Sequence, residues 1–465
     1  MTYKVVKFGG SNLRNSIGIQ NIIHAVKAYD CYLVIVVSAF YGVTDQLIEA
    51  IQQAVEGKLK INKFVNGLLD QKVEVAEKNL SDDSLFQDFK TELETRINKL
   101  RTYLLGINYI NDVPDFIYDE ILSYGERLSS LILYYILKDN HIDCSEVYPE
   151  NIGLITDGEF KNASVDVESS SERLKVSLSE LQTYVIPGFY GVSLEGKTNL
   201  LGRGGSDYSA AAIASCLNAE HLDLWKDVEG FLSADPLIVK NSINVESLTY
   251  LEAAELAYFG SKILHPRTSE PLRTKKIPIR IMNINHSEQG INPLTIINGK
   301  ERVTKNVVKS VSYSDHFGML KLHGSGVGVK PGILAKSTAY LDKAGINIKS
   351  VITSQTTINI LLADEDLHGA NKVIRANDIH GISEQEIIED ISLIAAVGEG
   401  LTSKYGIAGR MFTAVARKGI NVEIICFGAS SVAMYFIVSR KDRDKTVKAI
   451  HQEFFFEEAC CEVCV

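Results

Sequence analysis

The stretch Val5-Val6-Lys7-Phe8-Gly9-Gly10-Ser11 decides how the first half of the chain folds. Its apolar run is typical of a buried strand, and a helical pattern over residues 16–28 follows it. The two glycines let backbone N–H groups approach an anion closely, and Lys7 adds a cation at the same place. Since a glycine pair after a strand is more often a plain tight turn, the stretch alone predicts a strand–loop–helix unit and a candidate phosphate site.

Similar units follow as far as residue 283. Short β-rich runs at residues 32–38, 184–186 and 279–282 alternate with helical patterns, which is the signature of helices on a largely parallel sheet. The longest clear helical pattern, residues 121–137, carries Glu126 and Arg127 between its apolar positions. We expect one amphipathic helix to present this charged pair.

The periodicity fades between residues 284 and 305, where the sequence turns polar and loop-like. We expect a catalytic domain over residues 1–283, a linker over 284–305 and a second region over 306–465. In that region Gly332-Ile333 aligns with Gly406-Ile407, and Gly345-Ile346-Asn347-Ile348 aligns with Gly419-Ile420-Asn421-Val422, without a gap. The repeat predicts two small βα units, at about 318–390 and 391–465.

Composition narrows the class of protein. The chain has 465 residues, 45% of them hydrophobic, which is enough for several cores. A net charge of -10 without a basic block argues against nucleic acid as a partner. The first residues lack the order of a signal peptide, and the longest apolar run falls far short of the roughly 20 residues that span a bilayer. We expect a cytoplasmic protein that binds small molecules and no membrane.

The seven cysteines indicate reduced thiols rather than disulfides. Four are scattered singly, and we expect them to pack as small hydrophobic side chains: Cys31, Cys144, Cys216 and Cys426. The tail Cys460-Cys461-Glu462-Val463-Cys464 contains a C-x-x-C. Because no second ligand pair accompanies it, an apolar chain end is favoured over a metal or redox site, and we predict no metal-binding residues in the protein.

Three further motifs carry candidate chemistry. Gly202-Arg203-Gly204-Gly205-Ser206-Asp207 is a second glycine loop that leads into a helix, which Asp207 is expected to cap. Residues 224–236 form a strand that runs into a turn-rich loop, where aromatic and charged groups are expected to border a purine and its phosphates. Residues 259–266 place Lys262 beside a glycine at a helix junction. Taken singly, the three motifs also have plain interpretations, which are a capped turn, a surface loop and a solvated lysine respectively.

Taken together, these segments resemble the aspartokinase branch of the amino-acid kinase family over essentially the whole chain. Residues 7–10, 38–44, 125–129, 202–207, 225–236 and 259–266 occur in the family's order, and the C-terminal repeat resembles its paired ACT-type units. The resemblance implies an α/β amino-acid kinase fold, with a mainly parallel sheet sandwiched by helices. Two ferredoxin-like ACT-type βα units are expected to follow it.

The resemblance also implies an activity, in which ATP and Mg²⁺ are used to phosphorylate the side-chain carboxylate of L-aspartate. Lys7 is then expected to neutralise the transferring phosphoryl group, and Asp207 to hold the catalytic centre in place. Arg203 is expected to bind the substrate α-carboxylate and Glu126 the α-ammonium. The resemblance further assigns Ser38, Thr44 and Ser206 to the substrate, and Gly9, Gly10, Ser11, Trp225, Lys226, Asp227, Leu232, Lys262 and Ile263 to the nucleotide.

Two other readings stay open. Asn12 stands where the family usually has a hydroxyl, and Leu237 stands where many bacterial members have an arginine. Both departures would suit a catalytically weakened homologue that acts as a nucleotide or amino-acid sensor or as a partner subunit. A different carboxylate substrate is also compatible with the fold, although Glu126 favours one with a free ammonium.

The paired ACT-type units imply an amino-acid effector and a homodimer or higher homo-oligomer. Lysine-sensitive members of the family have an acidic position and a Ser-Glu pair along the effector strand. Here the aligned positions are Lys349 and Ser354-Gln355. We therefore expect L-lysine to inhibit weakly or not at all, and any effector to be a neutral amino acid such as threonine.

Overall fold

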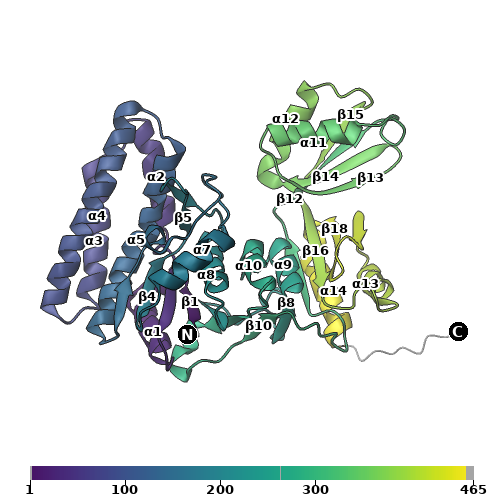
Figure 1. The fold of residues 1–465 in the computed structure, drawn as a ribbon. Coiled ribbons are helices and arrows are strands. Elements are labelled where there is room, and N and C mark those ends of the chain that lie inside the picture. Colours follow the sequence, from purple (N-terminus) through teal and green to yellow (C-terminus); the bar gives the residue numbers. More distant parts are fainter. Residues whose placement is uncertain (1–2, 262, 457–465) are drawn as a thin grey trace. The chain divides into compact units, whose positions relative to one another are not determined.

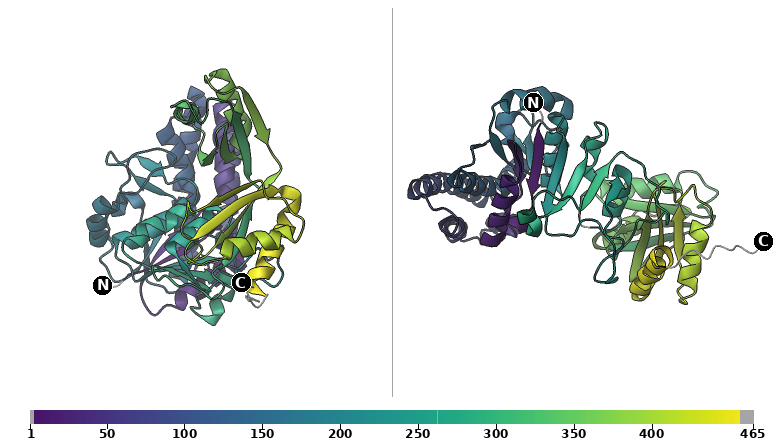
Figure 2. Two further views of the ribbon diagram at one scale, coloured as in Figure 1. Left: turned by 90° about the vertical axis from the view of Figure 1, so that its right-hand side faces the viewer. Right: turned by 90° about the horizontal axis from the view of Figure 1, so that it is seen from below.

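The computed structural model describes residues 3–261 and 263–456, and the chain divides into two compact units (Figures 1 and 2). Each unit is built from separate segments. Unit 1 comprises Met1–Phe231, Asn244–Ala257 and Lys262–Glu301, and unit 2 comprises Leu232–Ile243, Tyr258–Ser261 and Arg302–Val465. Within the described ranges, no helix is both long and apolar enough to cross a bilayer.

The core of unit 1 is an eight-stranded sheet in the order β3-β4-β2-β1-β7-β9-β10-β8. All neighbouring strands are parallel except β9 and β10. The strands are β1 Lys4–Phe8, β2 Leu33–Val37, β3 Cys144–Glu146, β4 Thr183–Pro187, β7 His221–Lys226, β8 Ser247–Thr249, β9 Ile279–Asn283 and β10 Thr295–Asn298; β5 Tyr190–Val192 and β6 Thr198–Leu200 form a separate pair. Strands β2, β1 and β7 are neighbours near the middle of the sheet and run parallel, so their carboxyl ends lie side by side.

The helices of unit 1 alternate with strands as predicted, except that four helices follow β2 in succession (Figure 1). They are α1 Ser16–Lys27, α2 Val43–Val55, α3 Ile61–Glu77, α4 Asp83–Ile110, α5 Asp115–Asp139, α6 Pro149–Ile152, α7 Val167–Ser177, α8 Gly205–Cys216, α9 Tyr250–Tyr258 and α10 Glu270–Arg273, with 3-10 turns η1 Gly10–Leu13, η2 Pro266–Thr268 and η3 Ile284–Gln289. The last residue of α9 falls in unit 2.

Helix α5 differs from the amphipathic helix that its sequence predicts, because every residue from 121 to 133 is buried. Arg127 is not a solvated charge. Its Nη1 donates to Glu150 Oε1 at 2.7 Å, its Nε donates to Ser123 Oγ at 2.9 Å, and its guanidinium lies 4.6 Å from the Tyr190 ring centroid. This ion pair leaves Glu126, one residue earlier, to face a different part of the unit.

The linker predicted over residues 284–305 is wrong. It contains η3 and β10, and β10 pairs with both β9 and β8. Unit 1 accordingly continues to Glu301. The strand contains three β-branched residues, Thr295, Ile296 and Ile297, but it is short and stands within a polar, loop-like stretch, which hides it in the sequence.

Unit 2 contains two antiparallel four-stranded sheets, β13-β14-β12-β15 and β11-β16-β18-β17. The strands are β11 Ser310–Ser314, β12 Phe317–His323, β13 Ile348–Thr353, β14 Thr357–Ala363, β15 Glu384–Ile388, β16 Ile391–Val397, β17 Ile424–Phe427 and β18 Ala433–Ser439, and the helices are α11 Ile333–Lys343, α12 Asp364–Ala376, α13 Ile407–Ala416 and α14 Arg443–Phe455, with a 3-10 turn η4 Arg440–Asp442. The predicted duplicated βα unit is confirmed.

The second repeat is not a continuous piece of chain. The first runs β12-α11-β13-β14-α12-β15 without a break, whereas the second runs β16-α13-β17-β18-α14 and takes β11, from before the first repeat, as its fourth strand. The predicted catalytic domain is interrupted as well, because residues 232–243 and 258–261 belong to unit 2. Both segments bind to β11. The Val311 N–H donates to the Ser233 carbonyl at 2.8 Å, and Ser312 Oγ donates to the Phe259 carbonyl at 3.0 Å.

A buried ion pair stabilises the centre of the unit 1 sheet. Asp223 on β7 is fully buried and accepts from Arg280 Nε on β9 at 2.6 Å. The Tyr29 hydroxyl also donates to Asp223, and the indole N–H of Trp225 donates to that hydroxyl at 3.2 Å. Burial opposes the ionisation of Asp223, but Arg280 and His221 outweigh it and hold the pKa below its usual range.

We predict that Asp223→Ala destabilises unit 1 by about 3 kcal/mol, because it leaves the Arg280 guanidinium partly buried without its anion. Trp225 is the chain's single tryptophan, so its fluorescence during urea unfolding reports on this unit alone. Lys78→Ala is the control, since it removes an exposed i,i+4 pair with Glu74 and is expected to leave the midpoint unchanged. Equal midpoints for Asp223→Ala and wild type would show that the pair contributes nothing net.

Candidate active site

Lys7 and Lys226 both form ion pairs with the carboxylate of Asp207, which follows the second glycine loop. Lys7 Nζ at the end of β1 lies 2.5 Å from Asp207 Oδ1, and Lys226 Nζ at the end of β7 lies 2.7 Å from Asp207 Oδ2. Lys7 and Asp207 are buried, and Lys226 is partly buried. These three predicted site residues come from separate parts of the sequence, and the sheet order brings them together.

The charges in this cluster depend on one another. Burial alone would raise the pKa of Asp207, but Lys226 and Lys7 outweigh it and hold that pKa well below its usual range. Burial lowers the pKa of Lys7, and the Asp207 carboxylate opposes this effect. Two ammonium groups on one carboxylate leave a local excess of one positive charge, which suits a phosphate group.

The sequence predicted that Asp207 caps α8, and this prediction is wrong. The N-cap is Gly204, whose φ of 69° is in the left-handed region, and Asp207 lies in the first turn of the helix. A Cβ at position 204 would lie 2.4 Å from the Cβ of His265, so glycine is needed both for the turn and for the close approach. The Asp207 side chain is therefore available for Lys7 and Lys226.

The first glycine loop packs against the loop that follows β2. A Cβ at Gly10 would lie 2.5 Å from the Ala39 carbonyl oxygen, whereas one at Gly9 would meet only Lys7 Nζ and Ser11 Oγ, at 3.7 and 3.8 Å. Asn12 is buried, and its Nδ2 donates to the Trp225 carbonyl at 2.8 Å. The residue that departs from the family pattern thus joins the loop to the end of β7.

Glu126 is a buried carboxylate with spare hydrogen-bonding capacity. It is 3% exposed, and its Oε1 accepts from Ser206 Oγ at 3.2 Å. Its Oε2 is buried and has no hydrogen-bond partner among the described residues. Burial raises the pKa of Glu126 to about 8, although the Ala39 N–H and Ser206 favour the ionised form. Such a group can receive an ammonium.

Two further predicted substrate residues border the same part of unit 1. The Ser38 N–H donates to the Phe8 carbonyl at 3.2 Å, which places Ser38 beside the first glycine loop. Thr44 Oγ1 lies 3.7 Å from the point where a Cβ at Gly125 would be, next to Glu126 on α5. Ser38 and Thr44 are half-buried, so their hydroxyls are not sealed in the core.

Arg203 is exposed in the second glycine loop, close to a residue that the sequence reasoning missed. His265 is half-buried, and burial together with Arg267 lowers its pKa, with Asp207 opposing and Arg203 adding to the effect. Arg267 in turn donates to the Leu201 carbonyl at 3.0 Å. The only sequence signal for His265 was its place in the segment 259–266.

The remaining residues predicted to bind the nucleotide differ in burial and in the unit to which they belong. The Trp225 indole is 1% exposed and stacks on Phe8 with ring centroids 6.5 Å apart, so it belongs to the core and cannot lie against a purine. Asp227 is exposed after β7, Ile263 is half-buried, and Leu232 belongs to unit 2. Lys262 and the C-terminal cysteines at 460, 461 and 464 lie outside the described residues.

The comparisons with known proteins agree with this geometry. A model of the amino acid kinase family matches residues 2–283, and ACT domain models match residues 312–376 and 394–454. Aspartokinase 1 of Arabidopsis thaliana chloroplasts is 30% identical over 469 residues, which cover 97% of this chain and 80% of that protein. A bifunctional aspartokinase/homoserine dehydrogenase of Buchnera aphidicola is 27% identical over 98% of this chain but only 57% of its own length. This chain thus spans about half the length of the bifunctional relatives.

Solved structures share the whole fold. The aspartate kinase of Clostridium acetobutylicum has a TM-score of 0.81 and 25% identity, and the match covers 97% of this chain and 100% of that one. E. coli aspartokinase III, solved in complex with aspartate and ADP, has a TM-score of 0.80 and 24% identity over the same shares of the two chains. With the kinase match, both ACT matches and the Arabidopsis relative in agreement, this chain belongs to the amino acid kinase family, in its aspartokinase branch.

Proposed function

We propose that the chain transfers the γ-phosphate of ATP to the side-chain carboxylate of L-aspartate. The observation that carries the proposal is the pair of consecutive residues Ser206 and Asp207. Ser206 contacts Glu126, which offers an unpartnered oxygen to an α-ammonium, and Asp207 holds the two lysines of the phosphate site. One helix start thus joins a group suited to an amino acid to a group suited to a phosphate.

The transfer requires no proton movement. The aspartate carboxylate is ionised near pH 7, so its oxygen forms the bond to the γ-phosphorus while the bond to the ADP oxygen breaks. The difficulty is repulsion between anions, which Lys7, Lys226 and the Gly9 and Gly10 N–H groups are placed to reduce. Arg203 is assigned to the substrate α-carboxylate, where a planar guanidinium binds both oxygens.

Mg²⁺ fits this site as a companion of the nucleotide. Both Asp207 oxygens face ammonium groups, and the described residues contain no group of three His, Cys, Asp or Glu side chains that could hold a metal ion. Mg²⁺ commonly binds through substrate phosphates and water with few protein ligands. When bound, it would supply further neutralisation of the phosphate charge.

Names and ligands of similar proteins support the proposal. Aspartokinase 1 and aspartokinase 2 of Arabidopsis chloroplasts are 30% and 29% identical to this chain, and the E. coli structure holds aspartate and ADP. The weakened-homologue reading is not favoured, because Lys7, Glu126, Arg203 and Asp207 are all present. Asn12, one of its two supports together with Leu237, has a structural contact with the Trp225 carbonyl.

Control by an amino acid remains part of the proposal. In unit 2, Lys349 lies on β13, and its Nζ is 5.8 Å from the Tyr258 ring centroid. A cation on this strand would repel the side chain of a lysine effector. We keep the expectation that L-lysine inhibits weakly and that any effector is neutral.

We predict that the protein with ATP, Mg²⁺ and L-aspartate forms 4-phospho-L-aspartate, trapped by hydroxylamine as the hydroxamate. N-acetyl-L-glutamate and bicarbonate are tested in place of aspartate, and neither has an ammonium for Glu126. Of the three compounds, only L-aspartate is expected to give a hydroxamate. No product at high aspartate would favour the sensor reading, and product with acetylglutamate would reassign the substrate.

We predict that Lys7→Ala lowers kcat about 100-fold, because the cation stabilises charge in the transition state more than in the ground state. Lys4→Ala, on the same strand, is the matched control and is expected to retain the wild-type kcat. Arg203→Ala is expected instead to raise the KM for aspartate. A near-normal kcat in Lys7→Ala would contradict the phosphate-site assignment.

We predict that the KM for aspartate falls as pH rises from about 6.5 and levels off only above about 9, one unit past the pKa of Glu126. Because its pKa is raised to about 8, Glu126 is mostly protonated at lower pH in the free protein, and it must ionise to bind an ammonium. Glu126→Gln is expected to have a high KM without this pH dependence. If the KM of Glu126→Gln changes with pH as steeply as that of the wild type, the titrating group is another residue.

A further inference from the structure

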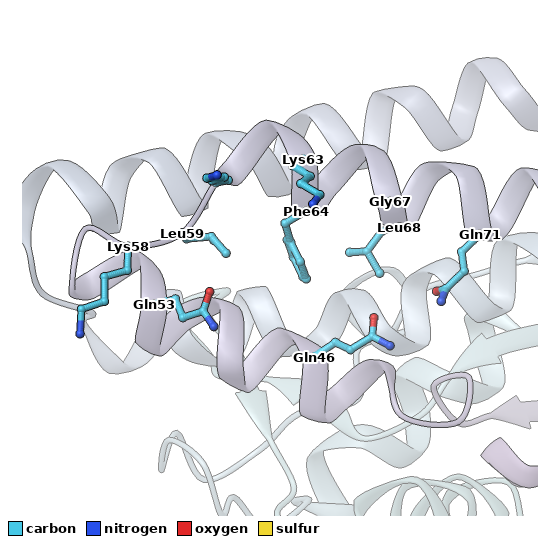
Figure 3. Close-up of a pocket in the computed structure, with 10 residues that line it drawn as sticks. Gln46, Gln53, Lys58, Leu59, Lys63, Phe64, Gly67, Leu68 and Gln71 are labelled. Atoms are coloured by element: carbon cyan, nitrogen blue, oxygen red, sulfur yellow. The ribbon is translucent and has the colours of Figure 1, made fainter.

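The buried stripe of α3 contains one charged residue. Its buried positions are Ile61, Val65, Leu68, Lys72 and Ala76, which follow helical spacing along one face. Figure 3 shows the neighbouring part of this helix, where Phe64 and Leu68 point into a groove of about 490 Å³ between α3 and α2. Lysines next to apolar surface normally extend their charged ends to water, but Lys72 is only 2% exposed.

An aromatic ring faces the buried ammonium. Lys72 Nζ lies 3.8 Å from the ring centroid of Phe40, which is itself buried. Within the described part of the chain, the ammonium has neither a hydrogen bond nor an ion pair. Burial alone lowers the pKa of Lys72 to about 7. The electron-rich face of Phe40 favours the charged form of Lys72 and offsets part of the cost of burying it.

Phe40 belongs to the connection between β2 and α2, which borders the aspartate site. The Phe40 N–H donates to Ser129 Oγ at 3.0 Å, and that hydroxyl donates to the Gly125 carbonyl on α5 at 2.9 Å. The preceding residue, Ala39, packs against α5 beside Glu126, because a Cβ at Gly125 would lie 2.8 Å from the Ala39 Cβ. Phe40 and Ala39 thus contact the same turns of α5 that carry Glu126.

We propose that Lys72 is a positioning residue of the aspartate site, whose ammonium holds the Phe40 ring and thereby keeps Ala39 packed against α5 beside Glu126. The inference rests on the proposed role of Glu126. Packing alone does not call for a cation, because a methionine would fill a similar volume without the cost of dehydrating an ammonium. Lys72 has its effect through Phe40 and Ala39 and does not contact the substrate.

The test compares Lys72→Met with Leu68→Met, a volume-conserving change one turn away on the same stripe. Lys72→Met is expected to melt at or above the wild-type temperature and to raise the KM for aspartate about tenfold, with the KM for ATP unchanged. Leu68→Met is expected to leave both KM values at the wild-type level. Lys72→Arg retains a cation over the ring and is expected to recover much of the lost affinity. A KM for aspartate in Lys72→Met within about twofold of wild type would overturn the proposal.

A second measurement does not depend on activity. Hydrogen–deuterium exchange of the segment 38–44 is expected to be faster in Lys72→Met than in wild type and unchanged in Leu68→Met. Equal exchange in all three proteins would overturn the positioning role. If the wild type fails to phosphorylate aspartate, the proposed function fails by itself, and the exchange result still decides whether Lys72 orders the loop.

Discussion

Asp207 is the residue on which the site depends. Lys7 and Lys226 are withdrawn from water, and unpaired ammonium groups in such surroundings would be costly. Because the two lysines end neighbouring parallel strands, one carboxylate in the first turn of α8 can serve both. This requirement fixes where α8 begins relative to the sheet, and it places Ser206 against Glu126 at the same time.

The sequence predicted the local units well and the long-range pairings poorly. The strand ending at Phe8 and the repeat starting at Gly332 and Gly406 are visible because their periodicity and glycines are local. Strand β10 was missed because its few β-branched residues stand within a polar, loop-like stretch. The break in the catalytic domain was missed because residues 232–243 pair with β11, far along the chain.

For the candidate site, the residue types were predictable and their surroundings were not. Glycine loops and charged residues indicated a phosphate site, and family resemblance supplied the roles. No local pattern indicated that the Trp225 ring stacks on Phe8, or that Asp207 binds two lysines and leaves the cap to Gly204. Burial decides both outcomes, and burial depends on which strands are neighbours.

The placement of β11 has a consequence for biosynthesis. This strand leaves the ribosome before the first ACT repeat, but its partner β16 is made only after that repeat is complete. An edge of unpaired backbone must therefore wait while the first repeat folds on its own. The same arrangement makes the first repeat a removable insert, whereas the second cannot be transferred to another protein as one uninterrupted cassette.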